Sequence, residues 1–115
     1  MKRVRLEYLD QNEGFSRCMP RTGCLAGQYT STDGAKDWCH VVLDVPISYG
    51  TVLMGRFVKT GDLLIRPREV GGEVGSARPT SVFLVLVEPP QLPLVTPLRI
   101  SDYLLVAWGT CHTVS

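Results

Sequence analysis

The stretch with the most chemical potential is a glycine-rich segment, residues 60–87, in which charged side chains lie between two apolar runs. These charged residues are Arg66, Arg68, Glu69, Glu73 and Arg78. Arginine recognises carboxylate or phosphate through paired hydrogen bonds, and backbone N–H groups in glycine-rich turns can add to an anion pocket. The segment therefore predicts a binding site for a small anionic ligand, made by its three arginines and Glu73.

Two Cys-His dipeptides, Cys39-His40 and Cys111-His112, supply the thiolate and imidazole ligands of tetrahedral zinc sites. Their spacing does not favour a metal. Neighbours in a strand point to opposite faces, and the other two cysteines are separated by five residues instead of two to four. A cysteine nucleophile would need a base and an orienting group that the sequence does not identify. We predict no metal and no other cofactor.

A second candidate surface lies in residues 36–45, where apolar and polar positions alternate with the period of a strand. The alternation predicts Cys39 on the core face and both Trp38 and His40 on the outer face. These two side chains could line a shallow aromatic binding site. The alternative for His40 is an ordinary surface residue with satisfied hydrogen bonds.

The glycine-rich segment also resembles a known signature. Its motifs are Gly61-Asp62, Gly71-Gly72-Glu73, Arg78-Pro79 and the apolar run Val82–Val87. They resemble the signature of MazF/PemK-type toxin endoribonucleases, which are small dimeric β-barrels that cleave RNA. The resemblance implies an acid/base role for Glu73 and a phosphate-stabilising role for Arg78. The chain departs from that family in length, since 60 residues precede Gly61 and 36 follow Pro79.

Composition narrows the function classes. The chain has 115 residues, of which 44% are hydrophobic and 20% charged, as expected for one folded domain spanning residues 1–115. A net charge of +1 gives the protein no overall electrostatic attraction for nucleic acid or acidic lipid. Nucleic acid is therefore an expected partner only in the toxin-like alternative described above. No signal peptide or membrane-spanning run is present, which predicts a cytoplasmic protein that does not bind membranes. In that compartment the cysteines should be free thiols: Cys18, Cys24, Cys39 and Cys111.

Strand-like patterns dominate the remaining sequence. Alternation predicts strands at residues 2–9 and 36–45, and turn-forming residues permit only short strands near 15–19 and 25–29. Pro46 and Gly50 bracket a predicted turn. Residues 51–58, with a bulge at Gly55, and residues 63–65 are predicted to form a hairpin joined by a tight connection at 59–62.

The C-terminal half completes this pattern. Residues 67–79 are predicted to form a mobile surface loop, and Val82–Val87 to form a central strand covered on both faces. Residues 88–98 contain four prolines and should connect the strands in an extended conformation. Residues 99–109 could form a strand or a short helix, and their β-forming side chains favour the strand.

The sequence as a whole predicts an all-β domain, a small barrel or two-layer sandwich of about six to eight mostly antiparallel strands with little or no helix. A homodimer is expected, because pairing would cover leftover apolar surface. The leading functional prediction is a non-enzymatic binding or accessory module that takes a small anionic ligand or a protein partner. The alternative is the toxin-like endoribonuclease, with Glu73 and Arg78 as its catalytic pair.

Overall fold

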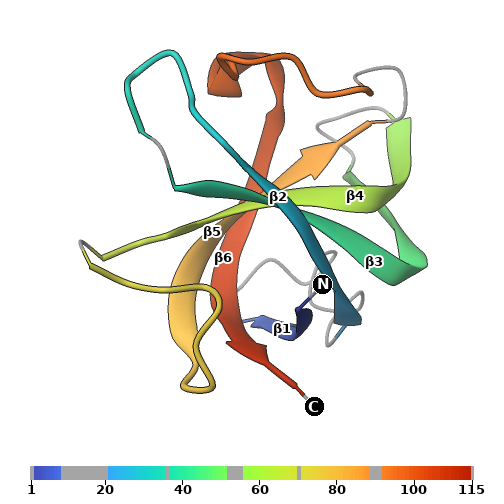
Figure 1. Cartoon of the computed structure of the whole chain (residues 1–115). Helices are drawn as coiled ribbons and strands as arrows, with labels where there is room; N and C mark the ends of the chain where they lie inside the picture. The colour runs from blue at the N-terminus through green and yellow to red at the C-terminus, as the bar shows by residue number, and fades with distance from the viewer. Residues whose placement is uncertain are drawn as a thin grey trace.

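The computed structural model describes residues 2–8, 21–35, 37–51, 56–69, 71–88 and 92–114. Its strands form a closed antiparallel barrel in which each strand pairs with the next and β6 pairs with β1 (Figure 1). The elements are β1 (Arg3–Tyr8), β2 (Arg21–Tyr29), β3 (Trp38–Thr51), β4 (Arg56–Pro67), β5 (Thr80–Val87), the 3-10 turn η2 (Ile100–Asp102) and β6 (Leu104–Thr113). The all-β prediction is confirmed, and a barrel is found instead of a sandwich. No helix in the described ranges is both long and apolar enough to cross a membrane.

Alternating side chains place β1 and β3 as predicted. Val4 and Leu6 of β1 are fully buried, and their neighbour Arg3 is exposed. In β3, Cys39 and Val41 face the barrel interior and join the same apolar cluster. The period of two in the sequence therefore identified the inner face of both strands.

The main departure from the predicted elements is that β3 and β4 are long, continuous strands. The predicted turn at 46–50 and the predicted tight connection at 59–62 both lie inside strands, so the predicted hairpin between 51–58 and 63–65 is wrong. Strand β3 ends at Thr51 and β4 begins at Arg56, and residues 52–55 lie outside the described residues. The predicted strand near 15–19 and the predicted bulge at Gly55 also lie outside them.

The turn-forming residues mark a bend shared by the two strands. The register between β3 and β4 shifts between Val42 and Ile47, and Pro46 lies in that irregular stretch. Proline has no N–H for a ladder hydrogen bond, so a bulge is where a paired strand can accommodate it. Gly61 lies beside it, since a Cβ there would be 3.8 Å from Pro46 Cγ. Proline and glycine at this point bend the strands without ending them.

Strand β5 is buried on both faces, as predicted. Val82, Leu84 and Leu86 belong to the interior cluster, whereas Val85 and Val87 belong to a second cluster outside the barrel wall. All five are at most 1% exposed. A strand covered on both sides needs apolar residues at every position, which explains the uninterrupted run in the sequence.

The cover for the outer cluster comes from the same chain. Residues 92–103 cross this part of the wall, and Leu98 is fully buried there with Trp38 and Leu64. Backbone hydrogen bonds hold Leu98 against the loop after β2, from Leu98 N to Thr30 O (2.7 Å) and from Thr32 N to Leu98 O (2.8 Å). The two segments lie together at the top of Figure 1. As predicted, the described part of 88–98 contains no strand.

Residues 99–109 combine the two predicted alternatives, because η2 precedes β6. The homodimer stays a prediction. The apolar strand that suggested it is covered by residues 92–103, and the large apolar side chains exposed within the described ranges are Val42, Val45 and Val95.

An ion pair on the outer surface ties together the first three strands. Arg3 of β1 binds both carboxylate oxygens of Asp44 in β3, at 2.7 Å for the Nη1–Oδ1 pair, and Thr22 Oγ1 of β2 donates to Asp44 Oδ2 at 2.7 Å. These hydrogen bonds lower the pKa of Asp44 from 3.8 to about 2. The ionised carboxylate is therefore favoured by folding.

Replacing this carboxylate should cause a pH-dependent loss of stability. Because the pKa of Asp44 is lower in the folded state, its contribution is complete above about pH 4 and is lost as the pH falls to about 2. Asp44→Asn should therefore lower the free energy of unfolding at pH 7 but have little effect near pH 2, measured by urea unfolding. Glu69→Gln, an equal charge change at an exposed position, is the control. If Asp44→Asn lowered the free energy of unfolding equally at both pH values, the ionised Asp44 carboxylate would not be the source of the stabilisation.

Candidate functional site

The glycine-rich loop between β4 and β5 closes one end of the barrel. Val74 is 7% exposed and belongs to the interior cluster, together with Cys39 and Cys111. The prediction of a surface loop was therefore wrong at this residue. The sequence hides the feature because one valine among glycines and charged residues shows no periodicity.

Glycines allow the loop to lie close against the barrel. Gly71 has a φ of 83°, which is a left-handed conformation that side chains disfavour. A Cβ on Gly72 would lie 3.0 Å from Pro67 Cβ and 3.2 Å from Thr80 Cγ2, so this position has little room for a side chain. The first glycine turns the chain and the second brings it against the end of the wall.

Hydrogen bonds fix the loop to three different strands or their flanks. Thr80 Oγ1 at the start of β5 donates to Glu73 O at 2.8 Å. Thr113 N in β6 donates to Ser76 O at 2.8 Å, and Lys2 Nζ before β1 donates to Gly75 O at 3.3 Å. The loop thus has a defined position over the end of the barrel.

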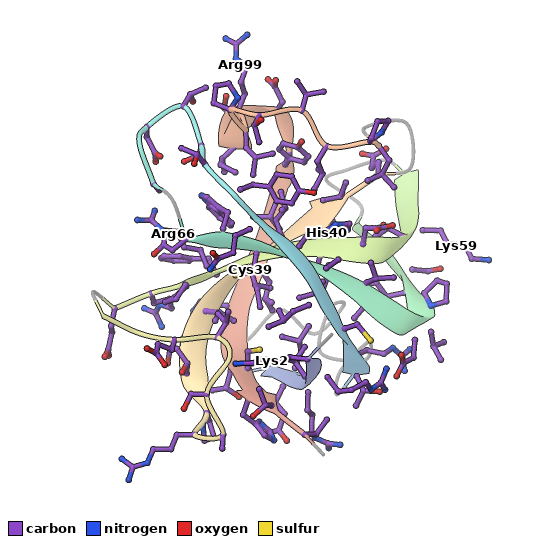
Figure 2. All side chains as sticks on the ribbon, in the orientation of Figure 1. Lys2, Cys39, His40, Lys59, Arg66 and Arg99 are labelled. Carbon is purple, nitrogen blue, oxygen red and sulfur yellow. The ribbon has the colours of Figure 1, made fainter. Side chains whose placement is uncertain are left out.

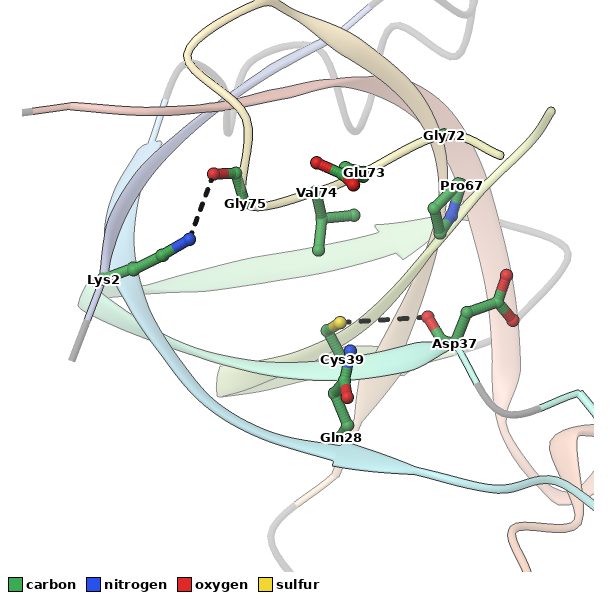
Figure 3. Close-up of a pocket in the computed structure, with 9 residues that line it drawn as sticks. All are labelled: Lys2, Gln28, Asp37, Cys39, Pro67, Gly72, Glu73, Val74 and Gly75. Atoms are coloured by element: carbon green, nitrogen blue, oxygen red, sulfur yellow. Dashed lines mark hydrogen bonds between the residues drawn. The ribbon is translucent and has the colours of Figure 1, made fainter. Parts of the chain in front are cut away.

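A hollow of about 280 Å³ remains beside Val74 (Figure 3). Its walls come from the loop, from the ends of β3 and β4, from β2 and from the residue before β1. They are formed by Lys2, Gln28, Asp37, Cys39, Pro67, Gly72, Glu73, Val74 and Gly75. A neighbouring hollow of about 410 Å³ extends along residues 25–28 of β2 and shares five of these residues. The end of the barrel therefore carries one continuous groove, which we call the mouth groove.

Charged groups surround the mouth groove. Asp37 is held by Arg66, whose Nε lies 2.8 Å from Asp37 Oδ1, and the Lys2 ammonium is bonded to the loop backbone. The Glu73 carboxylate has no hydrogen-bond or ion-pair partner among the described residues. Glu73 is consequently the acidic group at the groove that remains available to a ligand.

The predicted anion site is divided by the structure. Glu73 lines the mouth groove, but Arg66 and Arg68 point outward on either side of the buried Pro67. Arg78 is exposed and does not line the groove. Its backbone N–H donates a hydrogen bond to Ser76 Oγ at 3.1 Å. Figure 2 shows Arg66 on the outside of the barrel and Cys39 towards its middle. The four residues share one end of the molecule without forming one pocket.

Trp38 and His40 do not form the predicted open surface. They lie on the outer side of β3, as expected, but Trp38 is 4% exposed because residues 92–103 cover it. His40 Nε2 lies 2.7 Å from Asp62 Oδ1, and its ring meets Tyr29 edge-on at 6.4 Å. The covered Trp38 thus corrects the prediction. His40 is neither an open binding residue nor an ordinary surface residue, because its side chain is 12% exposed and its Nε2 is paired with Asp62.

The cysteine-histidine neighbours point to opposite sides of the wall. Cys39 and Cys111 belong to the interior cluster, whereas His40 pairs with Asp62 outside it. Within the described ranges, no three His, Cys, Asp or Glu side chains form a group that could hold a metal. Burial raises the pKa of both interior thiols, and that of Cys111 reaches about 12.

The interior thiols should resist alkylation in the native protein. The thiolate is the reactive form, and both exposure and ionisation are reduced for Cys39 and Cys111. Iodoacetamide at pH 8 should label the half-buried Cys24 in the native protein and the interior pair only after unfolding in urea, measured by peptide mass mapping. Equally fast labelling of the interior thiols in the native protein would show that the barrel is not packed as described.

Sequence reasoning missed two features of this end of the molecule. Lys2 and Asp37 reach the mouth groove from distant parts of the chain, and Trp108 lies beneath the Arg68 guanidinium with its ring centroid 4.1 Å from Cζ. No local motif could have found either, because both depend on which strands are neighbours in the barrel.

Comparisons with family models, curated protein sequences and solved structures found no match for this chain. The functional inference therefore rests on the residues and their geometry.

Proposed function

We propose that this protein is a non-enzymatic binding module and that the mouth groove holds a small polar molecule. The observation that carries the proposal is the Glu73 carboxylate, which has no partner in the described part of the chain and lies beside a hollow of about 280 Å³ on a firmly bonded loop. Ligand sites are typically concave and partly apolar, with a few convergent polar groups. Val74 and Cys39 supply the apolar floor, and Glu73 supplies a hydrogen-bond acceptor.

Charge defines the kind of ligand that suits the groove. Glu73 favours an ammonium or another hydrogen-bond donor, and Lys2, which also lines the groove, favours an acceptor. A small molecule with both groups, such as an amino acid or an amino sugar, meets both requirements. This differs from the purely anionic ligand predicted from the sequence, because the arginines do not line the groove.

The lining residues favour binding over catalysis. Among the described residues that line the 280 Å³ hollow, Cys39 is the one thiol, and none has a hydroxyl or imidazole side chain. Burial raises the pKa of Cys39, which suppresses the thiolate that a nucleophile requires. Glu73 and Lys2 are sufficient to bind a polar ligand, and binding requires no catalytic group.

A screen of small polar molecules tests this proposal. A ligand that binds only the folded protein stabilises it by about 2.7 kcal/mol at a concentration of 100 times its Kd, which raises the unfolding temperature. Amino acids, amino sugars and polyamines should include compounds that raise this temperature for the wild type. Glu73→Gln should abolish the shift, whereas Glu69→Gln, in the same loop but outside the groove lining, should preserve it.

Two outcomes would contradict the proposal. One is that no compound in these classes stabilises the wild type at millimolar concentration. The other is that stabilisation survives unchanged in both Glu73→Gln and Lys2→Met, which would place the ligand elsewhere.

Incubation with RNA distinguishes binding from the toxin-like alternative. We expect single-stranded RNA to remain intact in gel analysis, because Arg78 is not part of the groove that Glu73 lines. Cleavage that disappears in both Glu73→Gln and Arg78→Ala would instead support the endoribonuclease. Glu69→Gln serves again as the control for a charge change in this loop.

A further inference from the structure

A second polar feature lies on the outer wall, beside the mouth groove but formed by other residues. Strand register places Arg66 of β4 opposite Phe83 of β5, and Phe83 opposite Trp108 of β6. These positions face outward, because their neighbours Ile65 and Leu84 belong to the interior cluster. Two aromatic rings therefore lie side by side on the outside of the barrel, from strands that are far apart in the sequence.

Arg68 lies over this aromatic pair. Its Cζ atom is 4.1 Å from the ring centroid of Trp108 and 5.7 Å from that of Phe83. Cation–π contact on an indole favours a flat guanidinium and holds it in place. The backbone also anchors this residue, since Arg68 N donates to Ser81 O at 2.8 Å.

The Arg68 guanidinium has no acceptor among the described residues, although it is held in place. Its neighbour Arg66 binds Asp37, and Glu7 on the same wall binds Arg5 at 3.0 Å between Oε1 and Nε. An arginine stacked on an aromatic ring keeps its N–H groups in the plane of the guanidinium, where a carboxylate or phosphate can accept two of them. Arg68 is thus ordered for a ligand that the chain itself does not provide.

The guanidinium side of this platform is exposed, although Phe83 also packs against the outer cluster. Residues 92–103 cover the outer cluster around Trp38 and Leu98, but Arg68 remains exposed. Ser81 and Thr110 are cross-strand neighbours in the next row of the wall, level with Arg68 through its hydrogen bond to Ser81. Their half-buried hydroxyl groups provide further donors in that row.

We propose that Arg68, stacked on Trp108, anchors a second binding site that takes a single oxyanion group, either a phosphate monoester or a carboxylate. The stacked guanidinium meets the anion with its exposed edge, through two parallel hydrogen bonds. Because the indole already restricts the arginine, less side-chain freedom is lost on binding than for an unstacked arginine. The site is independent of the mouth groove, so it remains if the proposed function is wrong.

NMR titration of the isotope-labelled full chain tests this site directly. Inorganic phosphate and acetate are the two probes, each compared with sodium chloride at equal ionic strength. The Nε–H signals of Trp108 and Arg68 should shift saturably with at least one probe and not with chloride. The indole signal of Trp38 should remain unchanged, because that side chain is buried beneath residues 92–103. Which probe saturates at lower concentration identifies the oxyanion.

Matched variants distinguish binding by the paired hydrogen bonds of the stacked guanidinium from attraction by positive charge alone. Arg68→Lys keeps the charge but loses the paired hydrogen bonds, and should weaken binding by about tenfold or more. Arg99→Lys, at an exposed arginine immediately before η2 (Figure 2), should leave the affinity unchanged, as should Glu73→Gln in the mouth groove. An otherwise unchanged spectrum verifies that each variant is folded.

The proposal would be overturned if the wild type showed no saturable shift with either probe up to about 50 mM. This concentration is far above the millimolar range of weak sites. Equal affinity in Arg68→Lys would also overturn it, because it would reduce the site to nonspecific attraction.

Discussion

An apolar barrel interior has to be sealed at its end, and Val74 provides this seal where the glycine-rich loop crosses. The inward side chains of the strands bury one another along the wall, but closure of the sheet does not cover the core from above. Inserting Val74 solves this problem with one side chain and brings Glu73 and Gly75 to the rim. The mouth groove is what remains open beside that side chain, so the packing requirement and the candidate site have the same origin.

Residues 92–103 cover only part of the outer wall. Residues 92–103 cover the apolar half of β4 and β5, where Leu64, Val85 and Val87 would otherwise meet water. They do not cover Arg68, which stacks on Trp108. One side of a single sheet thus contains a second small core and an exposed charged platform. Both candidate sites lie at the end of the barrel where β4 leads into the loop.

The sequence predicted the elements better than it predicted the contacts between them. Alternation identified the inner faces of β1 and β3, and the uninterrupted run of β5 indicated burial on both sides. Pro46 and Gly61 were misread as turns, because the same residues that end a strand also permit a bulge within one. Local sequence cannot distinguish these two cases, since the difference depends on the neighbouring strand.

The candidate site was predicted in part for the same reason. The sequence predicts Glu73 and Arg68 as binding residues from their types and their glycine-rich surroundings, and this role stays a proposal. Their separation into a groove and an outer platform follows from Pro67, which points inward between Arg66 and Arg68. Lys2 and Trp108 could be added only once β1 was known to pair with β6 and β6 with β5.

The most direct test of this account is whether Val74 lies inside the barrel. Nuclear Overhauser contacts from its methyl groups, in a methyl-labelled sample of the full chain, measure this without any ligand. The account predicts contacts to the side chains of Cys39 and Cys111, which share the interior cluster with Val74. Methyl signals at random-coil positions with no contact to these residues would contradict it, because the loop would then not close the barrel and the mouth groove would not exist.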